Sequence, residues 1–178
     1  MRNVIHLGGR LLIICLVSGL LLGLVYNITL PYKEAAEAQA LQESLESVCA
    51  GGAFTELDIA SLAEEPGMED VLHLYGYTRG EETGHVAVVQ SMGYKGEVPV
   101  TVALTSAGEV IGIAIGSHEE TPGIGDRIET EEFTGQFLGM VPPVTGSAQT
   151  ISGATYSSSA VIAAVDLAYQ AVTLVKGA

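Results

Sequence analysis

The chain has 178 residues, and its 21 acidic residues outnumber 7 basic ones, which gives a formal net charge of −14. A surface this acidic excludes nucleic acid and anionic lipid as partners held by charge, and it favours cations or a basic protein face. The length suffices for one domain with an appended segment.

In chain order, the first element is an apolar segment at 11–30. Its core, LLIICLVSGLLLGLVY at 11–26, contains no charge, and about 20 helical residues span the roughly 30 Å hydrocarbon core of a bilayer. A cleaved signal peptide would have a shorter apolar run, about 7–15 residues, followed closely by small residues. Because Asn27, Pro31 and Tyr32 follow instead, we interpret 11–30 as an uncleaved transmembrane anchor.

The charges on either side of this segment predict its orientation. Arg2 and Arg10 precede the segment, whereas all 21 acidic residues and only five basic ones follow it. Positively charged flanks remain in the cytoplasm. We therefore expect residues 1–10 to be cytoplasmic and everything beyond the anchor to face the outside of the cytoplasmic membrane.

The next segment, 31–52, favours an amphipathic stalk helix. Residues 33–49 are rich in helix formers, and Gly51 and Gly52 follow as a stop signal. The apolar residues of this stretch recur on one helical face, at Ala38, Leu41, Leu45 and Val48. Such a helix would extend the anchor or pack on the domain that follows.

Residues 53–178 predict an α+β domain with a small antiparallel sheet and flanking helices. An acidic loop at 53–70, with at most one short helix, is expected first. Four β-prone runs separated by glycine-containing turns follow, with Ser-Ala-Gly at 106–108 joining the last two as a hairpin. These runs are 71–78, 85–92, 98–105 and 109–117, and a short helix at 130–137 follows them after a turn-rich segment.

The last helix carries the clearest helical pattern, and its start is rich in hydroxyl groups. Apolar residues recur at helical spacing, at Val161, Ala164, Val165, Ala168, Val172 and Val175. The sequence SGATYSSS at 152–159 precedes them. A helix N-terminus has about four unpaired N–H groups and a partial positive charge, so it binds phosphate readily. The same hydroxyls could equally serve as an ordinary N-cap, and spacing alone leaves both interpretations open.

Other chemistries find less support in the sequence. Cys15 lies within the anchor and Cys49 is alone beyond it, so we expect no intrachain disulfide between them. The triplet His118-Glu119-Glu120 could be read as metal ligands, but three adjacent loop residues rarely converge on one ion, and we predict no metal. Ser152 as a hydrolase nucleophile lacks the G-x-S-x-G elbow and an evident base. We expect no catalytic acid or base.

Two motifs together resemble a known family. SGATYSS at 152–158 and HEETPGIGDRIE at 118–129 are similar, in order and spacing, to the FMN-binding domain. That domain is shared by the G subunit of Rnf-type ion-translocating electron transport complexes and the C subunit of the sodium-pumping NADH:quinone reductase. The short charged N-terminus, single anchor and acidic outer domain also resemble the Rnf subunit over essentially the whole chain.

The resemblance implies a covalent cofactor. The threonine of the family motif, here Thr155, would bear FMN through a phosphoester, installed from FAD by a separate flavin transferase. The residues around it would surround the phosphate: Ser152, Gly153, Ala154, Ser157 and Ser158. The upstream loop would lie against the flavin ring: Glu120, Thr121, Pro122, Gly123, Ile124 and Gly125. A proline and two glycines fix a tight turn that a flat ring can approach closely.

The function that the resemblance implies is electron transfer. The chain would relay electrons through FMN within a membrane complex that couples ferredoxin and NAD to Na+ or H+ movement, with the other Rnf subunits as partners. Two alternatives stay open. One is the C-type subunit of the sodium-pumping quinone reductase, whose members are usually longer. The other is a cofactor-free anchored module that holds a complex together.

Overall fold

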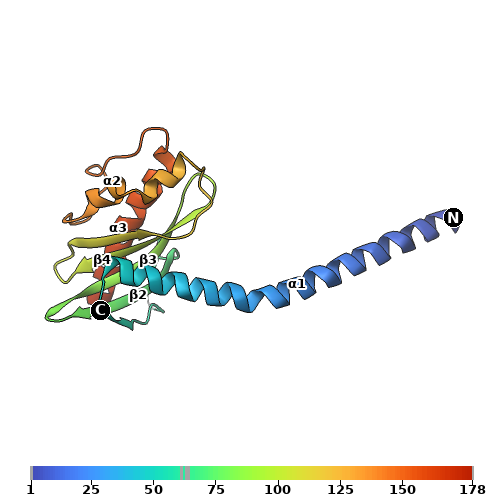
Figure 1. The fold of residues 1–178 in the computed structure, drawn as a ribbon, viewed down its shortest axis with the longest axis horizontal. Coiled ribbons are helices and arrows are strands. Elements are labelled where there is room, and N and C mark those ends of the chain that lie inside the picture. The colour runs from blue at the N-terminus through green and yellow to red at the C-terminus, as the bar shows by residue number, and fades with distance from the viewer. Residues whose placement is uncertain (1, 61, 63–64, 178) are drawn as a thin grey trace. The chain divides into compact units, whose positions relative to one another are not determined.

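The structure, a computed structural model, describes residues 2–60, 62 and 65–177. It divides into two compact units, Met1–Leu41 and Gln42–Ala178. The first unit consists of helix, and the second contains the sheet and the remaining helices (Figure 1).

A single helix, α1 (Arg2–Val48), forms the whole described part of the first unit and continues into the second. The helix runs through Pro31, so the anchor and the expected stalk are one element. The large apolar side chains between Leu11 and Ile28 are 50–75% exposed. Soluble proteins rarely expose a continuous apolar surface of this size. The length and composition of this stretch suit a membrane span. Of the two arginines before the span, only Arg10 has a described side chain.

The second unit is built on a five-stranded antiparallel sheet in the order β1-β2-β3-β4-β5, with each strand paired to its sequence neighbours. The four predicted strands are present, and the turn at 106–108 joins the last two as expected. The bounds are Ala53–Glu56 for β1, Val71–Arg79 for β2, Glu82–Met92 for β3, Glu97–Thr105 for β4 and Val110–Ile115 for β5.

The first strand, β1, was expected to be loop. It has only four residues, three of them exposed, and therefore shows no alternation of apolar and polar residues. It pairs along β2, with Phe54 opposite Tyr77. Because an edge strand of this length is held by backbone pairing with its neighbour, its own residues give no signal.

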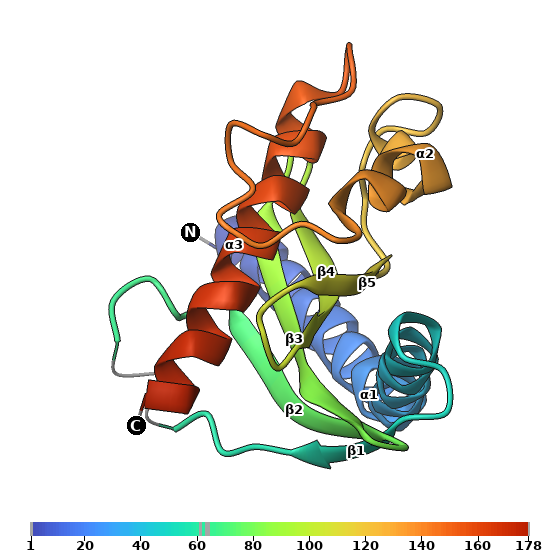
Figure 2. The same cartoon turned by 90° about the vertical axis from the view of Figure 1, so that its left-hand side faces the viewer.

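The last helix, α3 (Thr155–Gly177), covers one face of the sheet (Figure 2). Alanines 164 and 168 are fully buried against the sheet, and their small side chains permit close approach of helix and strands. The other side chains of this core include Val89 of β3, Val100 and Val102 of β4, and Val161 and Val165 of α3. The face of α3 that was predicted to be apolar therefore forms the core.

The opposite face of the sheet is covered by the last turns of α1, which belong to the same compact unit. Leu45 and Val48 are buried there, and the hydroxyls of Thr101 and Ser44 are 3.2 Å apart. Gly112 is required at this contact, because an added Cβ would lie 2.4 Å from the Val48 carbonyl oxygen. The domain thus begins before residue 53.

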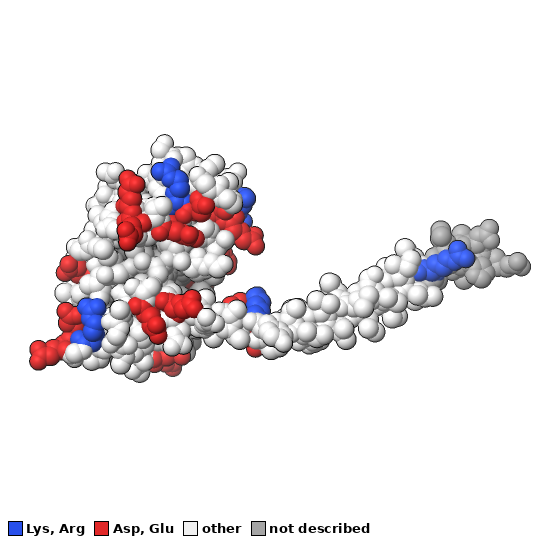
Figure 3. All heavy atoms as spheres, viewed as in Figure 1, with Lys and Arg blue, Asp and Glu red and all other residues white. Residues whose placement is uncertain are grey.

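Between β5 and α3 the chain forms three short helical segments: η2 (Gly125–Glu129), α2 (Glu131–Thr134) and η3 (Gly135–Phe137). The short helix expected at 130–137 is present as α2 continued by η3, so its first four residues are α-helical and its last three form a 3-10 turn. Phe133 and Phe137 pack edge to face at 5.5 Å, and burial of these two rings holds the tightened turns on the core. In the view of Figure 3, acidic side chains are spread over the domain and few basic ones lie among them.

Candidate functional site

The two sequence motifs meet around one cavity of about 420 Å³. Three segments line it: the turn after β3, the loop after β5 and the beginning of α3. Its residues are Tyr94, Glu120, Thr121, Ile124, Gly125, Gly153, Ala154, Thr155, Tyr156 and Ser157. The tertiary structure therefore brings together segments that lie about 30 residues apart in the sequence.

The beginning of α3 has the geometry of an anion site. The Ser158 N–H donates to the Ala154 carbonyl at 2.9 Å, so Ala154 is the residue that precedes the first helical turn. The amides of residues 155–157 then have no acceptor within the helix. Gly153 has a φ of +85°, a conformation that glycine adopts without strain. Thr155 is exposed on this first turn, whereas Ala154 is buried.

Ser157 and Ser158 are buried and already hydrogen-bonded. The Ser158 hydroxyl donates to the Ala154 carbonyl at 2.7 Å and accepts from the Ile151 N–H at 3.0 Å. The Ser157 hydroxyl donates to Glu120. These two serines therefore hold the loop before α3 in place, and Ser158 is not among the residues that line the cavity. Ser152 is exposed but lines a different cavity.

The loop at 120–125 is the tight turn that its proline and glycines predict. The Thr121 carbonyl accepts from the N–H groups of Ile124 at 3.1 Å and Gly125 at 2.8 Å. The Gly123 N–H donates to Asp126 Oδ2 at 2.9 Å, and its φ is +76°. Pro122 and Gly123 are exposed and do not line the cavity, whereas Thr121, Ile124 and Gly125 do.

Glu120 is a buried carboxylate in the wall of the cavity, 4% exposed. Its Oε1 accepts from the backbone N–H groups of Tyr94 at 2.9 Å and Lys95 at 3.0 Å, and its Oε2 accepts from Ser157. Burial acts to raise the pKa of Glu120, but the hydrogen bonds from Ser157, Lys95 and Tyr94, together with the electrostatic effect of His118, outweigh it, and the net pKa is lowered. The side chain is therefore ionised at neutral pH.

Two glycines, which have no side chain, make room for the carboxylate of Glu120. A Cβ added to Gly93 would lie 2.6 Å from Glu120 Oε1, and one added to Gly125 would lie 2.9 Å from Glu120 Oε2. Neither glycine has a positive φ, so close approach, and not backbone conformation, requires them. Gly125 was expected to admit a ring, and in the structure it also admits the carboxylate.

The side chain of His118 is hydrogen-bonded to the backbone of the same loop. Its Nδ1 accepts from the Glu120 N–H at 3.2 Å. Nε2 lies 2.9 Å from Glu129 Oε1 but is not aligned for a hydrogen bond. Within residues 2–60, 62 and 65–177, no three His, Cys, Asp or Glu side chains are grouped as metal ligands. His118 thus acts as a structural residue of the loop.

Two tyrosines stand at the rim of the cavity. Tyr94 is 67% exposed and Tyr156 is 73% exposed, and their ring centroids are 6.2 Å apart at a tilt of 42°. Tyr156 lies within the SGATYSS motif, directly after Thr155. Tyr94 was missed, although its place between Gly93 and Gly96 is a turn signal that offered a hint.

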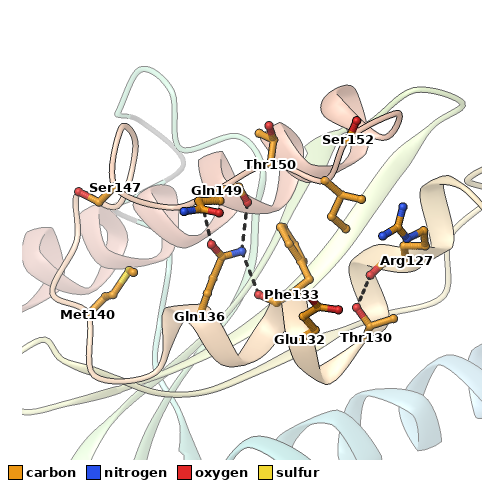
Figure 4. Close-up of a pocket in the computed structure, with 11 residues that line it drawn as sticks. Arg127, Thr130, Glu132, Phe133, Gln136, Met140, Ser147, Gln149, Thr150 and Ser152 are labelled. Atoms are coloured by element: carbon orange, nitrogen blue, oxygen red, sulfur yellow. Dashed lines mark hydrogen bonds between the residues drawn. The ribbon is translucent and has the colours of Figure 1, made fainter.

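A second cavity, of about 450 Å³, lies on α2 and the segment that leads to α3 (Figure 4). Gln136 closes one side of it: its side-chain amide donates to the carbonyls of Phe133 at 3.0 Å and Gln149 at 3.2 Å, and its Oε1 accepts from the Gln149 N–H at 2.7 Å. Arg127 and Ser152 contribute polar groups. Thr155 does not line this cavity, so the first cavity is the candidate site.

Comparison with known proteins agrees with this geometry. Residues 93–170 match the model of the FMN-binding domain. This range begins at the glycine that makes room for Glu120 and contains every residue that lines the first cavity. The cavity is therefore formed entirely by the part of the chain that matches the domain.

Curated relatives extend the similarity to nearly the whole chain. The G subunit of the proton-translocating ferredoxin:NAD+ oxidoreductase complex of Clostridium ljungdahlii is 31% identical over 94% of this chain and 91% of its own length. The G subunit of the ion-translocating oxidoreductase complex of Methanosarcina acetivorans is 30% identical over 94% and 93%. The corresponding G subunit of the Na+-translocating complex of Acetobacterium woodii is 30% identical over 95% and 91%. With an anchor-like helix, an FMN-binding domain and this end-to-end similarity, the chain belongs to the family of G subunits of ion-translocating ferredoxin:NAD+ oxidoreductase complexes.

Proposed function

We propose that the chain relays electrons within an ion-translocating ferredoxin:NAD+ oxidoreductase complex, through FMN esterified to the hydroxyl of Thr155. The observation that carries this proposal is the cavity in which exposed Thr155, the first turn of α3 and the loop at 120–125 meet. An FMN-binding domain supplies the cofactor class. Thr155 is the attachment residue that the resemblance to the family motif implies, and the chain's geometry supports this choice because Thr155 is exposed and lines the cavity.

The phosphate end of FMN fits the beginning of α3. The amides of residues 155–157 point along the helix axis without helical acceptors, and the helix dipole adds a partial positive charge there. A Cβ added at Gly153 would meet nothing within 4 Å, so the space beside Thr155 is open. Ser157 and Ser158 act indirectly, because their hydroxyls already fix the loop and Glu120.

The ring end of FMN fits the loop at 120–125 and the rim. Thr121 and Ile124 present a polar and an apolar group to the cavity, and Tyr94 with Tyr156 offers aromatic surface for a flat ring. Bound FMN accepts and donates electrons singly or in pairs. The protein orients it, and covalent attachment keeps it from diffusing away.

Maturation requires a second protein. Esterification joins Thr155 Oγ1 to the FMN phosphorus, breaks the pyrophosphate bond of FAD, releases AMP and leaves the hydroxyl proton to be taken up by a base. The carboxylate in the cavity, Glu120, is occupied by three donors, and no His or Lys lines the cavity within the described ranges. We infer that a flavin transferase supplies the base.

The proposed placement is a single-pass protein with residues 1–10 in the cytoplasm and the FMN domain outside. The apolar stretch of α1 supports membrane association, and the arginines before it support this orientation. Protease added to intact cells or spheroplasts should digest the domain and spare a tagged N-terminus. Digestion of the tag with the domain left intact would indicate the opposite orientation.

Intact-mass measurement tests the attachment. The full chain, expressed with and without a flavin transferase, should gain the mass of one FMN esterified with loss of water only when the transferase is present. Thr155→Ala should lose this mass and the in-gel flavin fluorescence while remaining folded, since Thr155 is exposed and surface substitutions change stability by about 0.5 kcal/mol or less.

Ser159→Ala is the matched control, because Ser159 is another exposed hydroxyl in the first turns of α3. It should carry flavin like the wild type. Flavin retained in Thr155→Ala would move the attachment to another residue. A wild-type chain that stays unmodified beside an active transferase would favour the cofactor-free scaffold.

A further inference from the structure

We propose that Glu120 is a positioning residue that holds the turn after β3 against the start of α3 and places one fixed negative charge beside the flavin ring, lowering the flavin's reduction potential. This inference rests on the proposed function. It differs from the expectation that Glu120 contacts the ring, because its two oxygens are turned to protein donors.

The positioning role follows from which segments Glu120 joins. The residue lies in the loop after β5, and it accepts hydrogen bonds from backbone amides 25 and 26 residues earlier and from a hydroxyl 37 residues later. All three segments line the cavity. The carboxylate therefore fixes the position of Tyr94 at the rim relative to the turn that carries Thr155.

The charge role follows from burial and from the donors. All three donors are neutral groups, two backbone amides and one hydroxyl, and Lys95 contributes only its backbone N–H. The negative charge is therefore solvated by dipoles and is not cancelled by a cation at hydrogen-bond distance among these donors. At 4% exposure the charge is little screened by water. Reduction adds electrons to the ring, and a neighbouring unscreened negative charge opposes that addition.

Glu120→Gln separates the charge from the shape. The backbone N–H groups of Tyr94 and Lys95 both donate to Oε1 of Glu120. In the glutamine variant the side-chain carbonyl oxygen can accept both hydrogen bonds. The new amide nitrogen takes the place of Oε2, and the Ser157 hydroxyl can accept from it instead of donating. The variant thus keeps three contacts and loses one charge. Ser157→Ala does the converse, because it removes a donor and keeps the charge.

Glu119→Gln is the matched control. It removes the same charge from the adjacent residue, which is exposed, so water and salt screen its effect. Glu120→Ala removes both the charge and the acceptor, and leaves the amides of Tyr94 and Lys95 without their partner.

The midpoint potential of the flavin-loaded full chain in detergent, measured by titration with dithionite, is the first readout. We expect Glu120→Gln to favour reduced over oxidised flavin by about tenfold or more at one solution potential, with wild-type flavin content by mass. Glu119→Gln should stay close to the wild type, and Ser157→Ala, which keeps the charge and removes one of its donors, should not favour reduced flavin. An unchanged potential in Glu120→Gln would overturn the charge role, whatever residue bears the flavin.

Amide hydrogen exchange at Tyr94 and Lys95 is the second readout, and it needs no flavin. Exchange should be at least about tenfold faster in Glu120→Ala than in Glu120→Gln or the wild type. Equal protection in all three would overturn the positioning role. A chain without flavin by mass would reject the proposed function, and the exchange result would still decide whether Glu120 fixes the turn.

Discussion

Two helices in the described part of the chain are long and apolar enough to cross a membrane, and only one of them is free to do so. None of the most apolar part of α1 is buried, whereas 56% of the most apolar part of α3 is buried within the domain. In α1 the apolar residues surround the helix, and in α3 they gather on the side that faces the sheet. Length and hydropathy alone do not distinguish a span from a core helix, but periodicity does.

The largest expected effect tests α3 as a core helix. Val165→Asp places a charge at a fully buried position and should abolish folding of the domain, a loss of about 4 kcal/mol or more. Ala163→Asp adds the same charge on the exposed face of the same helix and should leave the melting temperature nearly unchanged. Thermal melts followed by circular dichroism would compare them. An equal decrease in melting temperature in both variants would mean that α3 is buried on all sides.

The second prediction tests α1 as the span. Leu21→Arg puts a charge in the middle of the exposed apolar stretch and should cost about 2.5–3.5 kcal/mol of membrane insertion, with the melting temperature of the domain unchanged. Ala36→Arg, beyond the apolar stretch on the same helix, is the control. Alkaline extraction of membranes would measure retention, and full retention of Leu21→Arg would reject this segment as the sole anchor.

The smallest expected effect concerns the C-terminal end of α3. Burial lowers the pKa of His85 on β3, and the positive charge of Lys176 lowers it further. A histidine whose folded pKa is lowered binds more protons when unfolded, so the free energy of unfolding should decrease as pH falls below about 6.5 towards the folded value. His85→Gln should remove this part of the pH dependence.

The control for the pH experiment is His73→Gln, whose native side chain is 42% exposed beside Glu56. Urea unfolding at several pH values should show the acid-linked loss in the wild type and in this control alike. A loss of stability that persists in His85→Gln would assign the titration to other groups.

Most of the candidate site could be predicted from sequence because its parts are local. The turn at 120–125 depends on a proline and glycines within six residues, and the start of α3 depends on the glycine and alanine just before it. The roles of Ser157 and Ser158 could not be predicted, since a hydroxyl near a helix start can face a ligand or the protein. Their partners, Glu120 and Ile151, were set by folding.

The residues that were missed depend on distant pairing. Gly93 and Tyr94 reach the site only because β3 and β4 place their connecting turn beside a carboxylate 26 residues away in sequence. Likewise, β1 exists because β2 offers it an edge. Neither relationship leaves a repeating pattern in the residues themselves.

The amino-acid sequence by itself determined the apolar span, the alternating strands, the apolar face of the last helix and the two motifs, because each follows from the properties of neighbouring residues. Tertiary structure alone decided that the motifs share one cavity, that two serines are engaged inside the protein, and that a carboxylate is buried in the cavity wall. These features require contacts between segments that are distant in the chain, and only the packing of α3 and the loops on the sheet brings those segments together.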